Sequence, residues 1–183
     1  NEISYKTLRQ NIIDGLSKKE VLISKLTLIV TLSVAATVFL FLVSWVLGMI
    51  YSHVRGVDVM FRNLEFLPAY FLEVVTFLSF AFLLSLLIKK SGFVIILLFM
   101  YTLMFEPVAA AILENYPKTP EAIRAMVPFF PIKSLNNLIA VPYPKYIFLK
   151  VQDYVAFVDI IIVAGWLVVY NALILIILRK KDV

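Results

Sequence analysis

Four long apolar stretches, separated by polar segments, dominate the pattern of hydrophobic and polar residues along the chain. They cover residues 26–50, 66–88, 93–113 and 155–178. A helix needs about 20 predominantly apolar residues to cross the hydrocarbon core of a bilayer, and each stretch has that length. The pattern therefore predicts an all-α polytopic membrane protein with four transmembrane helices.

The polar segment before the first apolar stretch predicts a short helix at the membrane surface. Its apolar residues share one arc of a helical wheel, which also contains Arg9: Tyr5, Leu8, Ile12, Ile13 and Leu16. Gly15 favours a helix end, and Ser17–Glu20 has the S-x-x-E pattern of a capping box. Residues 1–25 therefore predict an amphipathic helix, a sharp turn and the start of the first span. This helix is either an interfacial anchor or a docking element for a soluble partner.

Residues 114–153 differ from the rest of the chain because they contain six of its eight prolines: Pro117, Pro120, Pro128, Pro131, Pro142 and Pro144. Amphipathic pieces lie between them at residues 121–127, 132–141 and 146–154, and each is too short to span a bilayer. Apolar, proline-broken sequence of this kind is typical of a re-entrant or interfacial segment. A plain extramembrane loop is the alternative, although so many apolar side chains are costly in water.

The distribution of basic residues predicts the orientation of the chain. With both ends in the cytoplasm, residues 1–25, 89–92 and 179–183 carry ten Lys or Arg in 34 residues. Residues 51–65 and 114–153, on the other side, carry seven in 55. Because Lys and Arg concentrate on the cytoplasmic side of a membrane, we expect both termini to be cytoplasmic.

Composition argues against several classes of function. The chain of 183 residues is 62% hydrophobic and 16% charged, with no cysteine and one histidine. These numbers disfavour a disulfide framework and a thiolate or histidine metal centre. The net charge of +5 comes without the aromatic-basic platform of a nucleic-acid-binding protein. No phosphate-binding loop or nucleophile–histidine–acid set is present, so we expect a chain that is not an enzyme.

Three acidic residues, Glu73, Glu106 and Asp159, fall within or near the predicted spans. Glu73 and Asp159 lie near span ends, where a structural role is favoured. Glu106 lies deeper, beside Pro107, which should free the carbonyl of Leu103 and kink the helix. An acid at membrane depth indicates function by default. Glu106 is expected to contact a polar head group, to carry a proton, or to clamp the re-entrant segment.

Glu2, Lys6-Thr7, the run Asp14–Glu20 and Lys25 resemble the coupling-helix region of type-2 ATP-binding-cassette (ABC) exporter permeases. The order of elements from this helix to the C-terminus is similar to the last four of the six spans in that family. The resemblance implies that the first two family spans are missing, so that the chain is the C-terminal part of a longer subunit. It also implies that an outer re-entrant helical hairpin separates the last two spans.

The resemblance implies a permease that exports a substrate by alternating access in a bacterial inner membrane. The apolar spans, which have few charges for a cavity, favour a lipid-like or amphipathic substrate. Its expected partners are a cytoplasmic ATP-binding subunit, which would hold ATP and Mg²⁺, a second permease subunit and membrane lipid, but no nucleic acid. This chain itself is expected to bind no cofactor and no metal. The alternative is a non-enzymatic scaffold or assembly subunit.

Two sets of candidate site residues follow. The set expected to receive the ATPase motion is Thr7, Arg9, Gln10, Asp14, Gly15, Ser17, Lys18, Lys19 and Glu20. The set expected at a substrate path or gate is Glu106, Pro107, Asn136 and Asn137. Helix capping and turn formation are the simpler explanation for the two asparagines.

Overall fold

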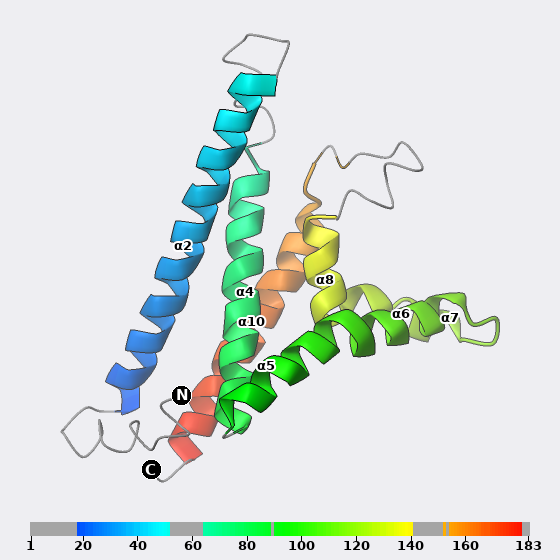
Figure 1. Cartoon of the computed structure of the whole chain (residues 1–183). Helices are drawn as coiled ribbons and strands as arrows, with labels where there is room; N and C mark the ends of the chain where they lie inside the picture. The colour runs from blue at the N-terminus through cyan, green and yellow to red at the C-terminus, as the bar shows by residue number, and fades with distance from the viewer. Residues whose placement is uncertain (1–17, 52–63, 89, 141–151, 153, 181–183) are drawn as a thin grey trace.

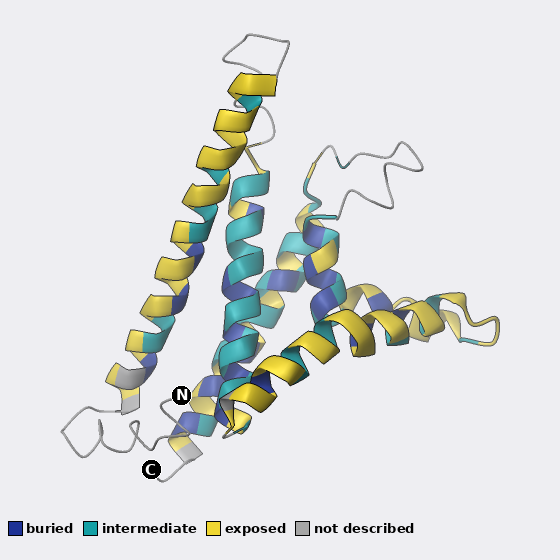
Figure 2. Cartoon of the chain, viewed as in Figure 1, coloured by how far each residue is buried: buried dark blue, intermediate teal, exposed yellow. Residues whose placement is uncertain are grey.

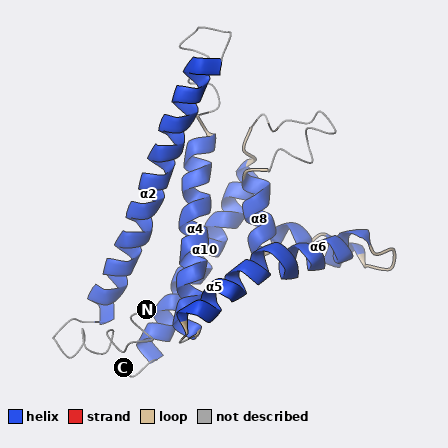
Figure 3. Cartoon of the chain, in the orientation of Figure 1, coloured by secondary structure: helices blue, strands red, loops and turns tan. Residues whose placement is uncertain are grey.

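A computed structural model describes residues 18–51, 64–88, 90–140, 152 and 154–180. All regular elements in these ranges are helical, and none is a strand (Figure 3). The α-helices are α2 (Lys18–Tyr51), α4 (Phe66–Leu87), α5 (Ser91–Met100), α6 (Glu106–Asn115), α7 (Glu121–Arg124), α8 (Pro131–Leu138) and α10 (Phe157–Lys180). The π-helix η1 covers Tyr101–Phe105, and the 3-10 helix η2 covers Val127–Phe129. The expected all-α fold class is confirmed.

Within the described ranges, four helical segments are long and apolar enough to cross a membrane, so the chain is an integral membrane protein. They are Leu22–Tyr51, Phe66–Leu87, Gly92–Asn115 and Phe157–Arg179. Each contains most or all of one apolar stretch seen in the sequence. The third segment joins α5, η1 and α6 into one helical run that lies obliquely to α4 (Figure 1). The amphipathic helix expected before the first span lies outside the described residues.

Helix α4 lies between α2 and α10 and packs against both (Figure 1). The core that joins the three helices contains Leu22 of α2, Leu83 and Leu86 of α4, and Ile174 and Leu178 of α10. Because Leu22 and Leu178 belong to one cluster, α2 begins and α10 ends at the same end of the bundle. Figure 2 shows that α2 exposes most of its surface. That surface is apolar, as expected for a helix that faces lipid.

Helix α8 is inserted between α10, α4 and α6 (Figure 1). Its buried side chains Ile132, Leu135 and Leu138 form a second core with Ala69 of α4 and Val163 of α10. Part of the segment predicted to be re-entrant or interfacial is thus packed against three membrane helices. The amphipathic piece expected at 121–127 is helical only in part, as α7 and the start of η2. The piece expected at 146–154 falls mainly outside the described residues.

The third span remains helical through Glu106 and Pro107, where the sequence predicts a freed carbonyl and a kink. The backbone N–H of Glu106 donates to the carbonyl of Tyr101, five residues back, which widens the helix by one π turn. Pro107 then occupies the first turn of α6, where its missing N–H costs little. The π turn thus accommodates the proline without ending the helix. Such turns are frequent at functional sites.

Candidate functional site

A groove of about 360 Å³ separates α6 from α8. From α6 it is lined by Glu106, Pro107, Ala110, Ala111 and Glu114, and from the α8 segment by Ile132, Lys133, Asn136, Asn137 and Ala140. Both sets follow the spacing i, i+1, i+4, i+5, i+8, which corresponds to one face of a helix. We call this cavity the α6–α8 groove. It brings together all four residues that the sequence assigns to a substrate path or gate, although their role there stays a prediction.

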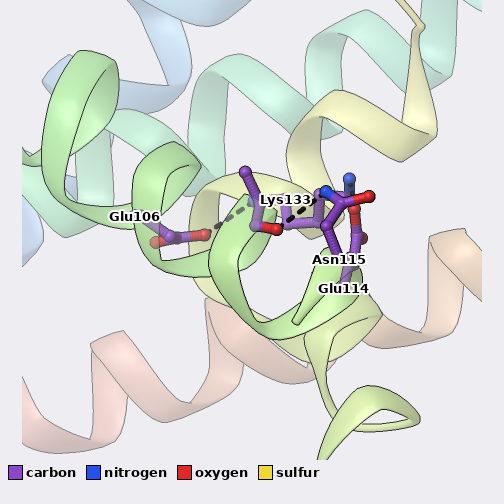
Figure 4. A network of polar contacts seen from close by, with 5 residues as sticks. Glu106, Glu114, Asn115 and Lys133 are labelled. Carbon is purple, nitrogen blue, oxygen red and sulfur yellow. Dashed lines mark hydrogen bonds and ion pairs between the residues drawn. The ribbon is translucent and has the colours of Figure 1, made fainter. Parts of the chain in front are cut away.

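Glu106 joins the two walls of the groove. Its side chain is 5% exposed, and its Oε1 accepts hydrogen bonds from the backbone N–H of Ile132 at 2.6 Å and of Lys133 at 2.7 Å. Figure 4 shows the bond to Lys133. These N–H groups belong to the first turn of α8, which has no intrahelical acceptor for them. The carboxylate also lies at the positive end of the helix dipole. Glu106 therefore caps a helix that lies far from it in the sequence.

In this arrangement, every backbone N–H group in the first turn of α8 has a hydrogen-bond acceptor. Pro131 has no N–H to satisfy. Ile132 and Lys133 donate to Glu106, and the N–H of Ser134 donates to the carbonyl of Phe130 at 2.8 Å. The N-cap position is held by Phe130, whose side chain has no acceptor. The cap of α8 therefore comes from α6 instead of from its own flanking sequence.

The second carboxylate oxygen of Glu106, Oε2, is buried and has no hydrogen bond of ordinary geometry to any described residue. The hydroxyl of Tyr101 lies near the carboxylate. Buried polar atoms are nearly always paired with a protein group, water or ligand. Apart from that hydroxyl, no described group lies ready to donate to Oε2 of this groove-lining residue.

Lys133 connects the groove walls a second time. Its Nζ lies 3.1 Å from Oε1 of Glu114 (Figure 4), and both side chains are about one-third exposed. Glu106 and Glu114 are two turns apart on the same face of α6. Lys133 is therefore tied through its backbone to the first and through its side chain to the second. Asn136 and Asn137, one turn further along α8, make no side-chain hydrogen bond to another described residue.

An aromatic cluster holds the turn that precedes α8. The indole Nε1 of Trp166, on α10, donates to the carbonyl of Phe129 at 2.8 Å. The Trp166 ring stacks on Tyr170 with centroids 5.4 Å apart. The ring of Phe80, on α4, lies beside those of Tyr170 and of Tyr101 in η1, with centroid distances of 5.2 Å and 5.5 Å. Adjacent rings thus link the π turn, α4 and α10, and the indole hydrogen bond joins this cluster to the turn before α8.

The remaining candidate residues lie elsewhere. Thr7, Arg9, Gln10, Asp14, Gly15 and Ser17 are outside the described residues. Lys18, Lys19 and Glu20 form the first turn of α2. Neither Glu73, on α4, nor Asp159, in the first turn of α10, lines the α6–α8 groove.

Sequence reasoning did not assign Glu114 and Trp166 to the site. Glu114 could have been found, because it follows Glu106 by eight residues on one helical face, with Ala110 between them. The bond from Trp166 to Phe129 has no comparable sequence signal, since its acceptor is a backbone carbonyl.

No curated protein and no solved structure matches this chain. A family described as "Protein of unknown function (DUF2705)" matches residues 1–183. That match covers the entire sequence, including the four membrane helices and both walls of the α6–α8 groove. The chain is therefore a member of the DUF2705 family.

Proposed function

We propose that this chain is the permease subunit of an ABC exporter. The observation that supports this most directly is the short helix α8, which is packed among three membrane helices and capped by the buried Glu106 beside a groove. Membrane transporters build substrate sites from discontinuous helices whose ends are buried in protein. The coupling-helix resemblance at residues 2–25 supports the same function independently.

In this proposal α8 is the gate. Among the described residues, its polar contacts with α6 are one carboxylate cap and one ion pair whose side chains are about one-third exposed. The core between α2, α4 and α10 is formed by different residues. Separation of α6 from α8 would therefore open the groove while the three-helix core stays intact. Alternating access needs such a contact with two discrete states.

The proposed input is ATP-driven closure of two cytoplasmic ATPase subunits against residues 7–20. Helix α2 begins at Lys18 and continues for 34 residues, a length of about 50 Å at 1.5 Å per residue. It packs on α4, α4 on α10, and α10 on α8. This chain of contacts is the proposed route from the coupling region to the gate. ATP and Mg²⁺ would be bound by the partner, and a second permease subunit would complete the cavity.

The same proposal sets the orientation. Helix α2 begins and α10 ends at one end of the bundle, and the excess of Lys and Arg lies in the flanking segments. We assign this end to the cytoplasm of a bacterial inner membrane. The α6–α8 groove would then belong to the path toward the outside.

The experiment is purification of the natural full-length subunit in mild detergent, with mass spectrometry of its partners and crosslinking from a single cysteine. Lys18→Cys places the cysteine at the start of α2, and Lys118→Cys is the matched control after α6. Recovery of an ATP-binding subunit that crosslinks to position 18 and not to 118 would support the exporter function. Recovery of membrane proteins alone, without a crosslink at 18, would overturn it and leave the scaffold alternative.

A further inference from the structure

We propose that the α6–α8 groove binds the head group of an amphipathic molecule that carries a protonated primary amine. As a binding site, this proposal stands on the groove alone. As an identification of the transported substrate, it rests on the proposed exporter function.

The charges that line the groove favour a cation. Two carboxylates, Glu106 and Glu114, face it together with one ammonium, that of Lys133. Lys133 pairs with Glu114. The partial positive charge at the N-terminal end of α8 stabilises the carboxylate of Glu106 but is smaller than one unit charge. One formal negative charge remains without a cationic side chain among the lining residues. An anionic head group would meet two carboxylates, whereas an ammonium group would supply the missing charge.

The hydrogen-bonding groups match the same ligand. An ammonium group has three donors and no acceptor. The groove offers amide oxygens from Asn136 and Asn137, which bond to no other described side chain or backbone group. It is also lined by Glu106, which is 95% buried and whose Oε2, covered by protein in this structure, has no hydrogen bond of ordinary geometry to any described residue. These acceptors come from both walls, so a bound amine would bridge α6 and α8.

The shape of the groove accommodates a head group and leaves the tail in lipid. Ala110, Ala111 and Ala140 have small side chains, which create the space between the helices. A volume of about 360 Å³ is at the lower end of the range for small-molecule sites. The adjoining face of α6 exposes Val108 and Ile112. An alkyl tail that leaves the groove would therefore meet an apolar, lipid-facing surface.

Photoaffinity labelling tests the proposal. The full chain in lipid nanodiscs would be labelled with a diazirine-bearing long-chain alkylamine, and the labelled residues would be mapped by mass spectrometry. Dodecylamine, dodecanol and dodecanoate serve as cationic, neutral and anionic competitors. We expect labelling in residues 106–115 and 131–140, with competition by dodecylamine alone. Equal competition by dodecanol or dodecanoate, or labelling confined to other helices, would overturn the proposal.

Two variants with matched controls sharpen this test. Ala111 is exposed and lines the groove, so Ala111→Leu should fill the groove and abolish labelling there. Val108→Leu, its control, enlarges an exposed residue of α6 outside the groove and should leave labelling unchanged. Glu114→Gln removes the net negative charge of the groove and leaves the Lys133 ammonium without its carboxylate partner, so it should weaken competition by about tenfold. Glu121→Gln, on α7 and outside the groove, should leave competition unchanged. Unaltered labelling in Ala111→Leu together with unaltered competition in Glu114→Gln would overturn the proposal.

No ATPase subunit takes part in this assay. Amine binding without a recovered ATPase partner would retain the site and reject the exporter function. Recovery of an ATPase partner together with unselective labelling would support the exporter function and reject the amine site.

Discussion

Oε1 of Glu106 accepts a hydrogen bond from the backbone N–H of Lys133 at 2.7 Å, although the two residues are 27 positions apart. The side chain of Lys133 also binds this face of α6, because its Nζ lies 3.1 Å from Oε1 of Glu114. Helix α8 is thus attached to α6 by a buried cap and by a more exposed ion pair. These two contacts should differ in strength, because burial determines how far solvent screens a charge.

Removal of the Glu106 cap should be costly. In Glu106→Ala, the N–H groups of Ile132 and Lys133 lose their common acceptor inside the protein. We expect a loss of roughly 2–4 kcal/mol in unfolding free energy, the range for buried donors that lose a charged partner. Glu106→Gln keeps a carbonyl acceptor and should lose less than half of this. Chemical denaturation in mixed micelles measures both, and an equal loss in the two variants would contradict the capping role.

The ion pair between Lys133 and Glu114 should contribute little to stability. Both side chains are about one-third exposed, and pairs of this kind are worth roughly 0.2–1 kcal/mol. A double-mutant cycle with Lys133→Met and Glu114→Gln, measured by the same denaturation, isolates their coupling. A coupling energy above about 2 kcal/mol would show that the pair behaves as a buried one.

The membrane helices could be predicted from sequence because the bilayer requires uninterrupted apolar residues over a known length. The importance of Glu106 could be predicted too, since an acid at membrane depth must face protein. Its partners could not, because they are two backbone N–H groups. One signal was present: Phe130-Pro131 begins α8 without a Ser, Thr, Asp or Asn to cap it. A buried helix that lacks its own cap needs an acceptor from elsewhere.

The π turn at Tyr101–Phe105 was also beyond sequence reasoning. Pro107 indicates that a backbone carbonyl loses its partner, but it does not determine whether the helix breaks, kinks or widens. In the widened form, the ring of Tyr101 packs against Phe80 of α4. The choice between these forms therefore depends on the neighbouring helix. Tertiary contacts of this kind leave no periodic pattern in the sequence.

The Trp166 indole should control the opening of the turn before α8. In Trp166→Phe the ring can still stack on Tyr170, but its hydrogen bond to the Phe129 carbonyl is lost. We expect a loss of about 1 kcal/mol, which corresponds to roughly fivefold faster local opening. Hydrogen exchange of the Ile132 and Lys133 amides measures this directly. Trp45→Phe, on the exposed face of α2, is the control and should leave that exchange unchanged.

Truncation in the three-helix core should destabilise the bundle without acting on the groove. Ile174 is fully buried, while the neighbouring Leu173 is 41% exposed. We expect Ile174→Ala to cost about 2 kcal/mol, the low end for buried aliphatic residues, because lipid and not water surrounds the separated helices. Leu173→Ala should cost less than about 1 kcal/mol. Denaturation in mixed micelles gives both values, and equal costs would indicate that α10 packs differently.

The coupling region provides the sharpest functional test, although it lies outside the described residues. In the exporter proposal, Asp14→Arg reverses a charge that faces the ATPase, and Gly15→Pro replaces the glycine that the sequence predicts to end the amphipathic helix. Each should abolish stimulation of ATP hydrolysis by the assembled complex while the chain still inserts into the membrane. Asp182→Arg, near the C-terminus, is the matched control and should retain stimulation. Loss of complex assembly with no effect on ATP hydrolysis would instead favour the scaffold, because a scaffold uses these residues for packing and not for transmission of motion.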